Sequence, residues 1–291
     1  MGGLLIVNPK ASGVTDALAE QVRVALDCPL EVVLTERSGE AGEIARGFEG
    51  KVDAIYVFSG DGTYNEVLNG VTGDVPLGFV PGGGTSVLPR ALGVPRDPVR
   101  AARALASGAP RSIGLGRVNG RRFGFNAGIG LDAELVRLID AHGRAEDGRR
   151  PGDRAFVRGA LGLLTGNRGR FPDVLEVEGA GRAAFAFVAN CDPYTYAGRV
   201  PLHVSRGASF DLGLDLVAPR HVRARSIPRI GVALVRGARP GRHLLVVHDA
   251  RRIVVRCDAP MPLQADGEDL GDVEAAVFED EPRAVRVLVP R

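Results

Sequence analysis

Residues 53–71 read DAIYVFSGDGTYNEVLNGV, and this stretch decides the fold. Ala54 to Phe58 form an unbroken apolar and aromatic run, which is typical of a strand buried on both faces of a parallel sheet. The next four residues, 59–62, have small side chains or none and predict a tight turn. Thr63 and Glu66 have the spacing of a capping box, and apolar residues follow at helical spacing. The stretch therefore predicts a strand, a glycine turn and a helix.

The predicted glycine turn has the features of an anion site. Backbone N–H groups at a helix N-terminus attract an anion, and the helix dipole strengthens that attraction. Gly60 and Gly62 would let a phosphate approach the backbone, because no Cβ stands in the way. Asp61 fits beside a phosphate if it acts through Mg²⁺ or takes a proton from an attacking hydroxyl. The alternative is an ordinary strand–helix turn, since short glycine motifs often occur by chance.

Similar turns follow two other predicted strands in the first 112 residues. Strands are predicted at 4–7, 30–35 and 77–80 with helices between them, which indicates a doubly wound parallel sheet. The Gly-, Ser- and Thr-rich turns at 8–13, 59–63 and 81–86 would lie at the carboxyl ends of strands, where open α/β sheets bind ligands. The sequence therefore predicts an α/β nucleotide-binding domain over residues 1–112.

The pattern changes near residue 112 to short strands separated by turn residues. This predicts an antiparallel β-sandwich over residues 113–280, so the expected fold class is α/β plus all-β. Helices are predicted at 155–164 and near 227–235, and a charged loop at 140–154 precedes the first of them. The strand candidates are 122–126, 174–177, 184–189, 214–217, 244–247, 253–256, 275–278 and 285–289.

The composition describes an ordinary globular protein that is long enough for two domains. Hydrophobic residues make up 45% of its 291 residues and charged residues 25%, and the net charge of +2 implies no overall electrostatic partner. The three cysteines are widely spaced, which fits a reducing compartment and excludes a cysteine-built metal site. No apolar run is long enough for a transmembrane helix or a signal peptide. We therefore expect a cytoplasmic protein.

Five motifs occur in order along nearly the whole chain. They are NPKASG at 8–13, SGDGTYNEVLNG at 59–70, PGGGTS with RALGVP at 81–86 and 90–95, NAGIGLDA at 126–133, and LQADGE at 263–268. Together they resemble the motifs of the diacylglycerol kinase catalytic family, which also contains the sphingosine kinases and related bacterial lipid kinases. The second motif is similar to the family's GGDGT signature, with the serine that sphingosine kinases place first.

This resemblance implies ATP- and Mg²⁺-dependent phosphorylation of a lipid hydroxyl, with the nucleotide in a cleft between the two domains. It also implies that the last strand returns to the first domain, so residues 281–291 would join residues 1–112. The implied catalytic residues are Asp61, Asp266 and Glu268, with Asp61 and Glu268 at the metal. The implied nucleotide-binding residues are Asn8, Pro9, Ser12, Gly13, Thr35, Ser59, Gly60, Gly62, Thr63, Glu66, Gly83, Gly84 and Thr85.

The chain departs from the family pattern at one site position. Many members carry Asn-Asp where this chain has Ser86-Val87, so one carboxylate that could serve Mg²⁺ is missing. Whether another acid, such as Asp74 or Asp132, replaces it is left open. For the late motif, the alternative is a hairpin turn whose acids at 266 and 268 are simply exposed.

Residues 220–256 contain ten arginines, three histidines and a single acid, Asp249. One interpretation is a surface that meets anionic lipid headgroups, where each basic residue contributes ~1 kcal/mol. The alternative is a solvated face. No nucleic-acid partner is expected, because aromatic residues do not alternate with the basic ones and no known motif is present. We therefore expect peripheral association with an anionic membrane surface; a homodimer is left open.

The leading prediction is an ATP-dependent kinase that phosphorylates diacylglycerol or a related lipid with a free hydroxyl. One alternative is a kinase for a smaller alcohol, since the related sheet architecture also serves such enzymes. The other is a noncatalytic nucleotide- or lipid-binding protein, which the valine at position 87 suggests.

Overall fold

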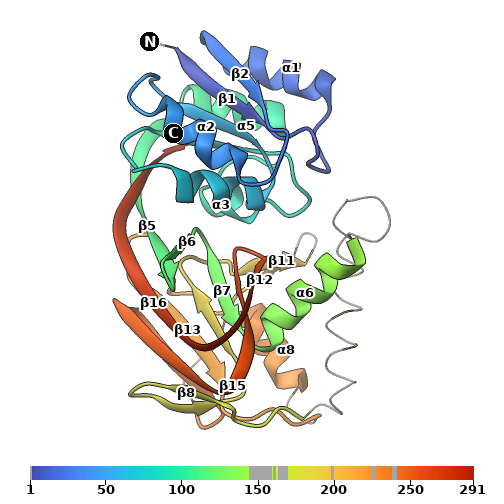
Figure 1. Ribbon diagram of the computed structural model, residues 1–291, viewed down its shortest axis with the longest axis vertical. Helices are drawn as coiled ribbons and strands as arrows, with labels where there is room; N and C mark the ends of the chain where they lie inside the picture. The colour runs from blue at the N-terminus through green and yellow to red at the C-terminus, as the bar shows by residue number, and fades with distance from the viewer. Residues whose placement is uncertain are drawn as a thin grey trace. The chain divides into compact units, whose positions relative to one another are not determined.

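The computed structural model describes residues 2–143, 159, 162, 170–197, 200–224, 227–237 and 241–291. It divides into two compact units, one of Met1–Leu115 with Pro282–Arg291 and the other of Gly116–Glu281 (Figure 1). The sequence placed these boundaries after residues 112 and 280. The strands β5 (Ala109–Val118) and β16 (Glu268–Val289) carry the chain from one unit to the other.

The first unit is built on a parallel sheet with the order β4-β3-β1-β2. Its strands are β1 (Gly3–Val7), β2 (Leu30–Leu34), β3 (Ile55–Ser59) and β4 (Leu77–Pro81). All residues of β1, β3 and β4 are buried, as their continuous apolar runs predicted. The end of β16 extends the sheet beside β4, where Val287 pairs in parallel with Leu77.

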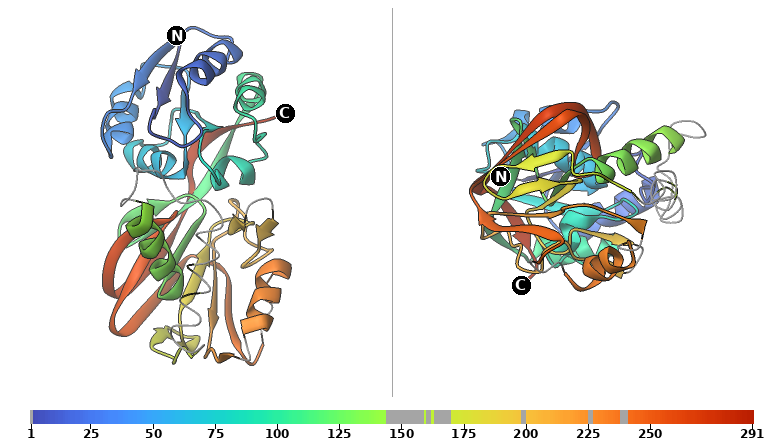
Figure 2. Two further views of the ribbon diagram at one scale, coloured as in Figure 1. Left: turned by 90° about the vertical axis from the view of Figure 1, so that its right-hand side faces the viewer. Right: turned by 90° about the horizontal axis from the view of Figure 1, so that it is seen from below.

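Helices cover this sheet on both sides, which confirms the predicted doubly wound α/β architecture (Figure 2, left). They are α1 (Asp16–Ala25), α2 (Glu40–Phe48), α3 (Asp61–Gly70), α4 (Val87–Ala91) and α5 (Pro98–Ala106). The helix α1 packs with α5, and α2 packs with α3. Glycine makes the second contact close, since a Cβ on Gly70 would lie 2.3 Å from the carbonyl oxygen of Gly42.

The second unit is rich in antiparallel sheet, with the strand order β14-β13-β10-β7-β15-β16. These strands are β7 (Asn126–Ile129), β10 (Ala186–Ala189), β13 (Leu214–Pro219), β14 (Leu244–Ala250) and β15 (Arg252–Ala265). The shorter strands are β6 (Arg121–Phe123), β8 (Leu175–Val177), β9 (Gly181–Ala183), β11 (Thr195–Ala197) and β12 (Val200–Leu202). The helices are α6 (Leu131–Gly143) and α8 (Ile227–Arg236), and α8 confirms the helix predicted near 227–235.

Buried side chains form the cores of the two units. In the first unit, Phe58 and Phe79 are fully buried, and the ring of Phe79 packs against that of Tyr64 of α3. In the second unit, one cluster contains Phe123 and Phe278. A second cluster there contains three aromatic rings in edge contact, those of Phe185, Phe187 and Tyr194. None of the helices in the described part of the chain has the length and apolar character of a membrane span.

Three sequence-based assignments in the second half need correction. The strand predicted at 122–126 is interrupted, because β6 ends at Phe123 and β7 begins at Asn126. The strands predicted at 275–278 and 285–289 are one strand, β16. The turn-like residues between them include Pro282, where the chain passes from one unit to the other.

The third correction concerns α6, which was not predicted. It continues to Gly143, so the first residues of the loop predicted at 140–154 are helical. The rest of that loop lies outside the described residues. Of the helix predicted at 155–164, only Gly159 and Gly162 are described.

Candidate functional site

The three loops that the sequence singled out meet at the carboxyl ends of β1, β3 and β4. The backbone N–H of Gly13 donates to the carbonyl of Gly82 at 2.9 Å, which joins the first loop to the third. The N–H of Gly82 donates to the carbonyl of Ser59 at 2.6 Å, which joins the third to the second. Gly60 and Gly83 touch through their backbones, since a Cβ on Gly83 would lie 2.8 Å from the Cα of Gly60. The loops therefore form one site.

A polar contact through Thr63 fastens the first loop to the second. Its Oγ1 accepts hydrogen bonds from Asn8 Nδ2 at 3.0 Å and from Ser59 Oγ at 2.8 Å. Thr63 therefore does not cap the helix, and the capping-box prediction is wrong. The N-cap is Gly60, whose extended backbone (φ −107°, ψ 178°) lets α3 begin at Asp61 and places Thr63 inside the first turn.

The N-terminus of α3 has no side-chain cap, because its N-cap residue is a glycine. Two other helices of this unit have one: Thr15 Oγ1 accepts from Leu18 N before α1, and Asp97 Oδ1 accepts from Arg100 N before α5. Uncapped N–H groups and the helix dipole favour an anion at this end of α3. With the glycine backbones of three loops around it, the site has the geometry and the polarity that suit a phosphate group.

Asp61 bonds to the backbone of α4, directly after the third loop. Its Oδ2 accepts from Val87 N at 3.0 Å and its Oδ1 from Leu88 N at 3.2 Å, so it binds the first residues of α4. The preceding residue, Ser86, has a positive φ of 49° and gives α4 no side-chain cap. Asp61 is partly exposed. The chain lacks an acid at position 87. The carboxylate of Asp61 lies against the backbone of that residue.

Asp61 is suited to hold Mg²⁺ through one oxygen or through water. Its carboxylate bonds to the backbone of α4 and is partly exposed, so a metal ion can approach it directly or through water. Among the described residues, no group of three or more His, Cys, Asp or Glu side chains is arranged to hold a metal. Magnesium in kinases commonly takes one or two carboxylates and completes its shell with water and substrate phosphates. The donor set here fits that arrangement.

Most of the remaining residues predicted in the first unit lie in these loops, whereas Thr35 and Glu66 lie outside them. Gly84 is exposed, and a Cβ built on it would meet nothing within 4 Å. The N–H of Thr35, at the end of β2, donates to the carbonyl of Val7 at 2.9 Å. Glu66 lies on α3 and accepts from Ser38 Oγ at 3.3 Å. Pro9 and Ser12 are exposed in the first loop, Gly62 lies in α3, and Thr85 is partly exposed in the third loop.

Sequence reasoning gave no role to two cationic residues, Lys10 in the first loop and Arg90 on α4. Lys10 Nζ donates to the carbonyl of Glu36 at 2.8 Å, and Arg90 Nη1 donates to the carbonyl of Thr85 at 3.5 Å. Lys10 was recognisable only as one of the two lysines in the chain. Both residues bring positive charge to loops that are predicted to bind phosphate.

Asp266, in the second unit, is enclosed by backbone donors. Its carboxylate accepts from the N–H groups of Gly124 at 2.6 Å, Phe125 at 3.0 Å and Asn126 at 3.2 Å. The residue is 2% exposed and has a φ of +49°. Its own N–H donates to the carbonyl of Asn126 at 2.8 Å. Asp266 therefore holds the segment between β6 and β7 against the end of β15.

Glu268 forms an ion pair with Arg121, and both side chains are partly exposed. The partners are 147 residues apart, and no spacing in the sequence pointed to the pair. The acids at 266 and 268 are therefore not two free carboxylates on an exposed turn, because one is buried and the other is paired.

A polar cluster beside Asp266 contains a third acid, Asp132. Its Oδ2 accepts from the hydroxyl of Tyr194 at 2.6 Å and from Gln264 Nε2 at 2.6 Å. A Cβ on Gly128 would lie 2.3 Å from this oxygen, so the glycine makes room for the carboxylate. Burial raises the pKa of Asp132, and it raises the pKa of Tyr194 well above its usual value. Gln264 was not singled out as a site residue by the sequence.

The class of protein follows from comparison with known families. Residues 3–118 match the model of the diacylglycerol kinase catalytic domain, which confirms the resemblance that the motifs predicted. A diacylglycerol kinase of Bacillus subtilis (strain 168) is 26% identical over 257 residues, which cover 82% of this chain and 78% of that protein.

A second relative is more similar over a shorter stretch. A diacylglycerol kinase of Staphylococcus saprophyticus is 36% identical over 94 residues, which cover 31% of this chain and 30% of that protein. The solved structure of a diacylglycerol kinase from Bacillus anthracis aligns with a TM-score of 0.72 at 21% identity, covering 99% of this chain and 96% of that one. That similarity shows a shared fold.

Proposed function

We propose that the protein is an ATP-dependent lipid kinase that transfers the γ-phosphate to a hydroxyl of diacylglycerol or a related lipid. The observation that carries this proposal is the meeting of the three loops, with Asp61 of the second loop bonded to the start of α4, directly after the third. Backbone amides, a helix N-terminus and one carboxylate in a single site suit the handling of phosphate groups. The relatives named as diacylglycerol kinases support a lipid as the acceptor.

The proposed chemistry depends on positioning and on charge neutralisation, as phosphoryl transfer generally does. The glycine backbones of the three loops bind and orient the phosphates, and the first turn of α3 directs its N–H groups at them. Asp61 either accepts the proton of the lipid hydroxyl or holds the metal. Bound Mg²⁺ would neutralise phosphate charge there. That the nucleotide lies in a cleft between the two domains stays a prediction.

Transfer of ³²P from ATP tests the proposed function directly. The acceptors would be diacylglycerol, ceramide and a sphingoid base in mixed micelles, compared with glycerol and other small alcohols at varied Mg²⁺. We expect labelled lipid and dependence on the metal. Transfer only to a small alcohol would favour the small-alcohol kinase. No transfer to any acceptor, together with tight ATP binding, would favour the noncatalytic protein.

Replacing Gly84 with valine tests the nucleotide site without disturbing the protein around it. A side chain at this exposed position meets no protein atom within 4 Å at its Cβ, so the fold should tolerate it. We expect ATP affinity to fall about tenfold or more, because a branched side chain would occupy space beside the phosphates.

The matched control is Gly47→Val, on α2, where a Cβ also meets nothing within 4 Å. The control should bind ATP like the wild type in isothermal titration calorimetry. If Gly84→Val binds ATP equally well, the phosphates do not lie against the third loop, and the proposed binding mode is wrong.

A further inference from the structure

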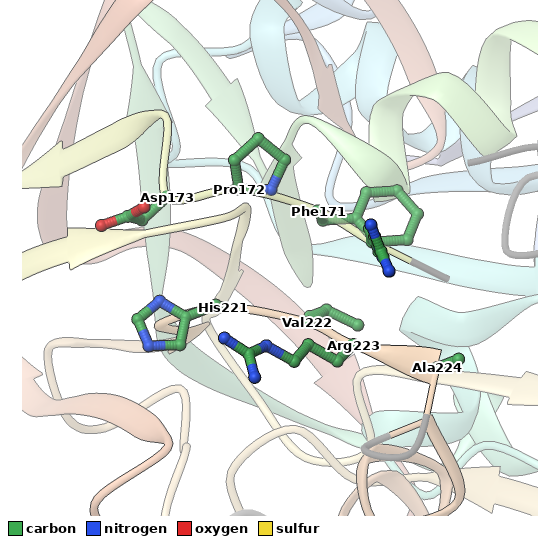
Figure 3. Close-up of a pocket in the computed structure, with 8 residues that line it drawn as sticks. Phe171, Pro172, Asp173, His221, Val222, Arg223 and Ala224 are labelled. Carbon is green, nitrogen blue, oxygen red and sulfur yellow. The ribbon is translucent and has the colours of Figure 1, made fainter. Parts of the chain in front are cut away.

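The second unit contains a cavity of about 750 Å³ that has no part in the proposed chemistry. It lies between two chain segments, one carrying Arg170 to Asp173 and the other carrying His221 to Ala224 (Figure 3). A cavity of this volume is within the range of ~300–1,000 Å³ that is usual for sites binding small molecules.

The floor of this cavity is fixed by pairing and packing. Phe171 and Val222 form a bridge in which each backbone N–H donates to the other's carbonyl, at 2.9 and 3.2 Å. Val222 is 2% exposed, and the ring of Phe171 lies edge-on to Phe185 at a centroid distance of 5.9 Å. Both segments that carry the lining side chains, 170–173 and 221–224, are therefore anchored to the core.

The charge of the lining is predominantly positive. Two arginines, Arg170 and Arg223, line the cavity with one acid, Asp173, and His221 also lines it; the arginines and His221 are exposed. In Figure 3 the side chain of Arg223 extends towards the ring of His221, and Asp173 lies apart from them on the facing segment. Arg182 lies beside Asp173, with its Nε 3.8 Å from the carboxylate and 3.1 Å from the carbonyl oxygen. Guanidinium groups of this kind match phosphate oxygens well.

The surroundings of the cavity favour a lipid surface over a dissolved anion. The helix α8 begins only three residues after Ala224, and it exposes Val232 and Val235 at 51% and 48%. Its Ile230 packs against the hydrophobic cluster that contains Val222. A short helix with exposed apolar residues beside cationic ones has the character of an element that lies at a membrane interface.

We propose that this cavity binds the phosphate-bearing headgroup of an anionic phospholipid while the protein is docked on a bilayer. Arg170 and Arg223 would contact the phosphate, and His221 would donate a hydrogen bond to it or to the glycerol. The proposal goes beyond the kinase function and does not depend on phosphoryl transfer. It replaces a general attraction of residues 220–256 to membranes with one defined site.

Vesicle flotation without nucleotide tests this site. The probes are vesicles of phosphatidylcholine alone and of phosphatidylcholine mixed with phosphatidylglycerol. Wild-type protein should float with the mixed vesicles only. The double variant Arg170→Gln with Arg223→Gln should lose at least about tenfold in affinity for the mixed vesicles, since each basic residue near an anionic membrane contributes substantially to binding.

The control variant is Arg252→Gln with Arg256→Gln, which removes two charges from the same basic segment outside the cavity. These arginines are exposed, and their ion pairs with described residues are long, at 3.8 Å from Arg252 to Glu279 and 3.7 Å from Arg256 to Glu178. The control should retain most of the binding. Equal losses in both double variants would show diffuse attraction and would overturn the proposal.

Two further outcomes also decide the matter. If inorganic phosphate without vesicles binds the wild type but not the double variant, while both bind mixed vesicles equally, the cavity binds a free anion and the lipid assignment is wrong. If the wild type does not float with mixed vesicles, the site does not act at membranes. Kinase activity on lipid dispersed in detergent is measured separately, so failure of the headgroup site and failure of the kinase proposal remain distinguishable.

Discussion

Asp61 and Asp266 both hold their carboxylates against backbone N–H groups of another segment, but the two environments differ. Asp61 accepts two such bonds, from Val87 and Leu88, and stays partly exposed at the three loops. Asp266 accepts three, from consecutive residues 124–126, and is 2% exposed. The sequence assigned catalysis to both.

We expect this difference to separate a carboxylate that meets a ligand from one that maintains the fold. A buried carboxylate with three amide donors is expensive to disturb, because each donor would lose its partner away from water. A partly exposed one can keep its two amide bonds and still meet a metal or a hydroxyl. We therefore expect Asp61→Asn to lower turnover and Asp266→Asn to lower the stability of the fold.

The largest effect is expected for Asp61→Asn on turnover. Loss of a general base commonly costs about 10²–10⁴-fold, and asparagine retains the shape but loses the charge and most of the basicity. The fold should lose only ~1 kcal/mol, because an amide oxygen can still accept one of the two backbone bonds. The measurements are ³²P transfer to the best lipid acceptor and urea unfolding of the same preparation.

Asp74→Asn is the matched control for this change. Asp74 is an exposed aspartate of the same unit that was considered only as a substitute acid. Its variant should keep activity within about twofold, as expected for a surface change away from the loops. Full activity in Asp61→Asn would show that Asp61 has no part in the mechanism. The proposed difference in role between Asp61 and Asp266 would then be wrong.

The next effect in size is expected for Asp266→Asn on stability. An asparagine amide can offer its oxygen to Phe125 and Asn126, but its NH₂ group would then face the N–H of Gly124, now 2.6 Å from Oδ2. A buried donor left without a partner costs ~1–3 kcal/mol. Urea unfolding should show a loss of this size, and hydrogen exchange of the amides at 124–126 should speed up.

The control for the backbone conformation is Asp27→Asn. Asp27 is exposed and has the same φ of 49° as Asp266, so any effect of asparagine on that conformation appears in both variants. The control should be as stable as the wild type. If Asp266→Asn is stable and keeps protected amides yet lacks kinase activity, Asp266 is a catalytic residue, as the sequence predicted.

The first unit could be predicted from the sequence because its signals are local. Each strand is one apolar run, and each loop follows its strand directly. In a parallel sheet these loops must meet at one edge, so the site at residues 8–13, 59–63 and 81–86 followed from the order of the elements. What the pattern missed was the use of the side chains: Thr63 ties two loops together, and Asp61 binds α4.

The second unit was harder to predict because its contacts are distant in the chain. Asp266 meets amides that are about 140 residues earlier, and Glu268 meets Arg121 across 147 residues. These meetings depend on the register of β7 with β15, in which Gln264 lies opposite Gly128. No local pattern encodes that register. The residue types at 266–268 were recognised, but their partners could not be.

A third acid, Asp132, sharpens the comparison, because neutral side chains hold it in place of backbone amides. Burial raises its pKa, so the folded state takes up a proton more readily there than the unfolded chain does. The stabilisation from this group is complete below the pKa of the unfolded chain, near 3.8, and is lost as the pH rises through the pKa of the folded state.

Asp132→Asn should remove this loss, because its amide oxygen can still accept from Tyr194 and Gln264. The unfolding free energy of the variant relative to the wild type should therefore rise with pH above ~4 and then level off, a smaller effect than that of Asp266→Asn. Urea unfolding across this pH range measures it, with Asp74→Asn expected to show no such trend. A variant that grows less stable relative to the wild type as the pH rises would mean that the charged form of Asp132 stabilises the fold.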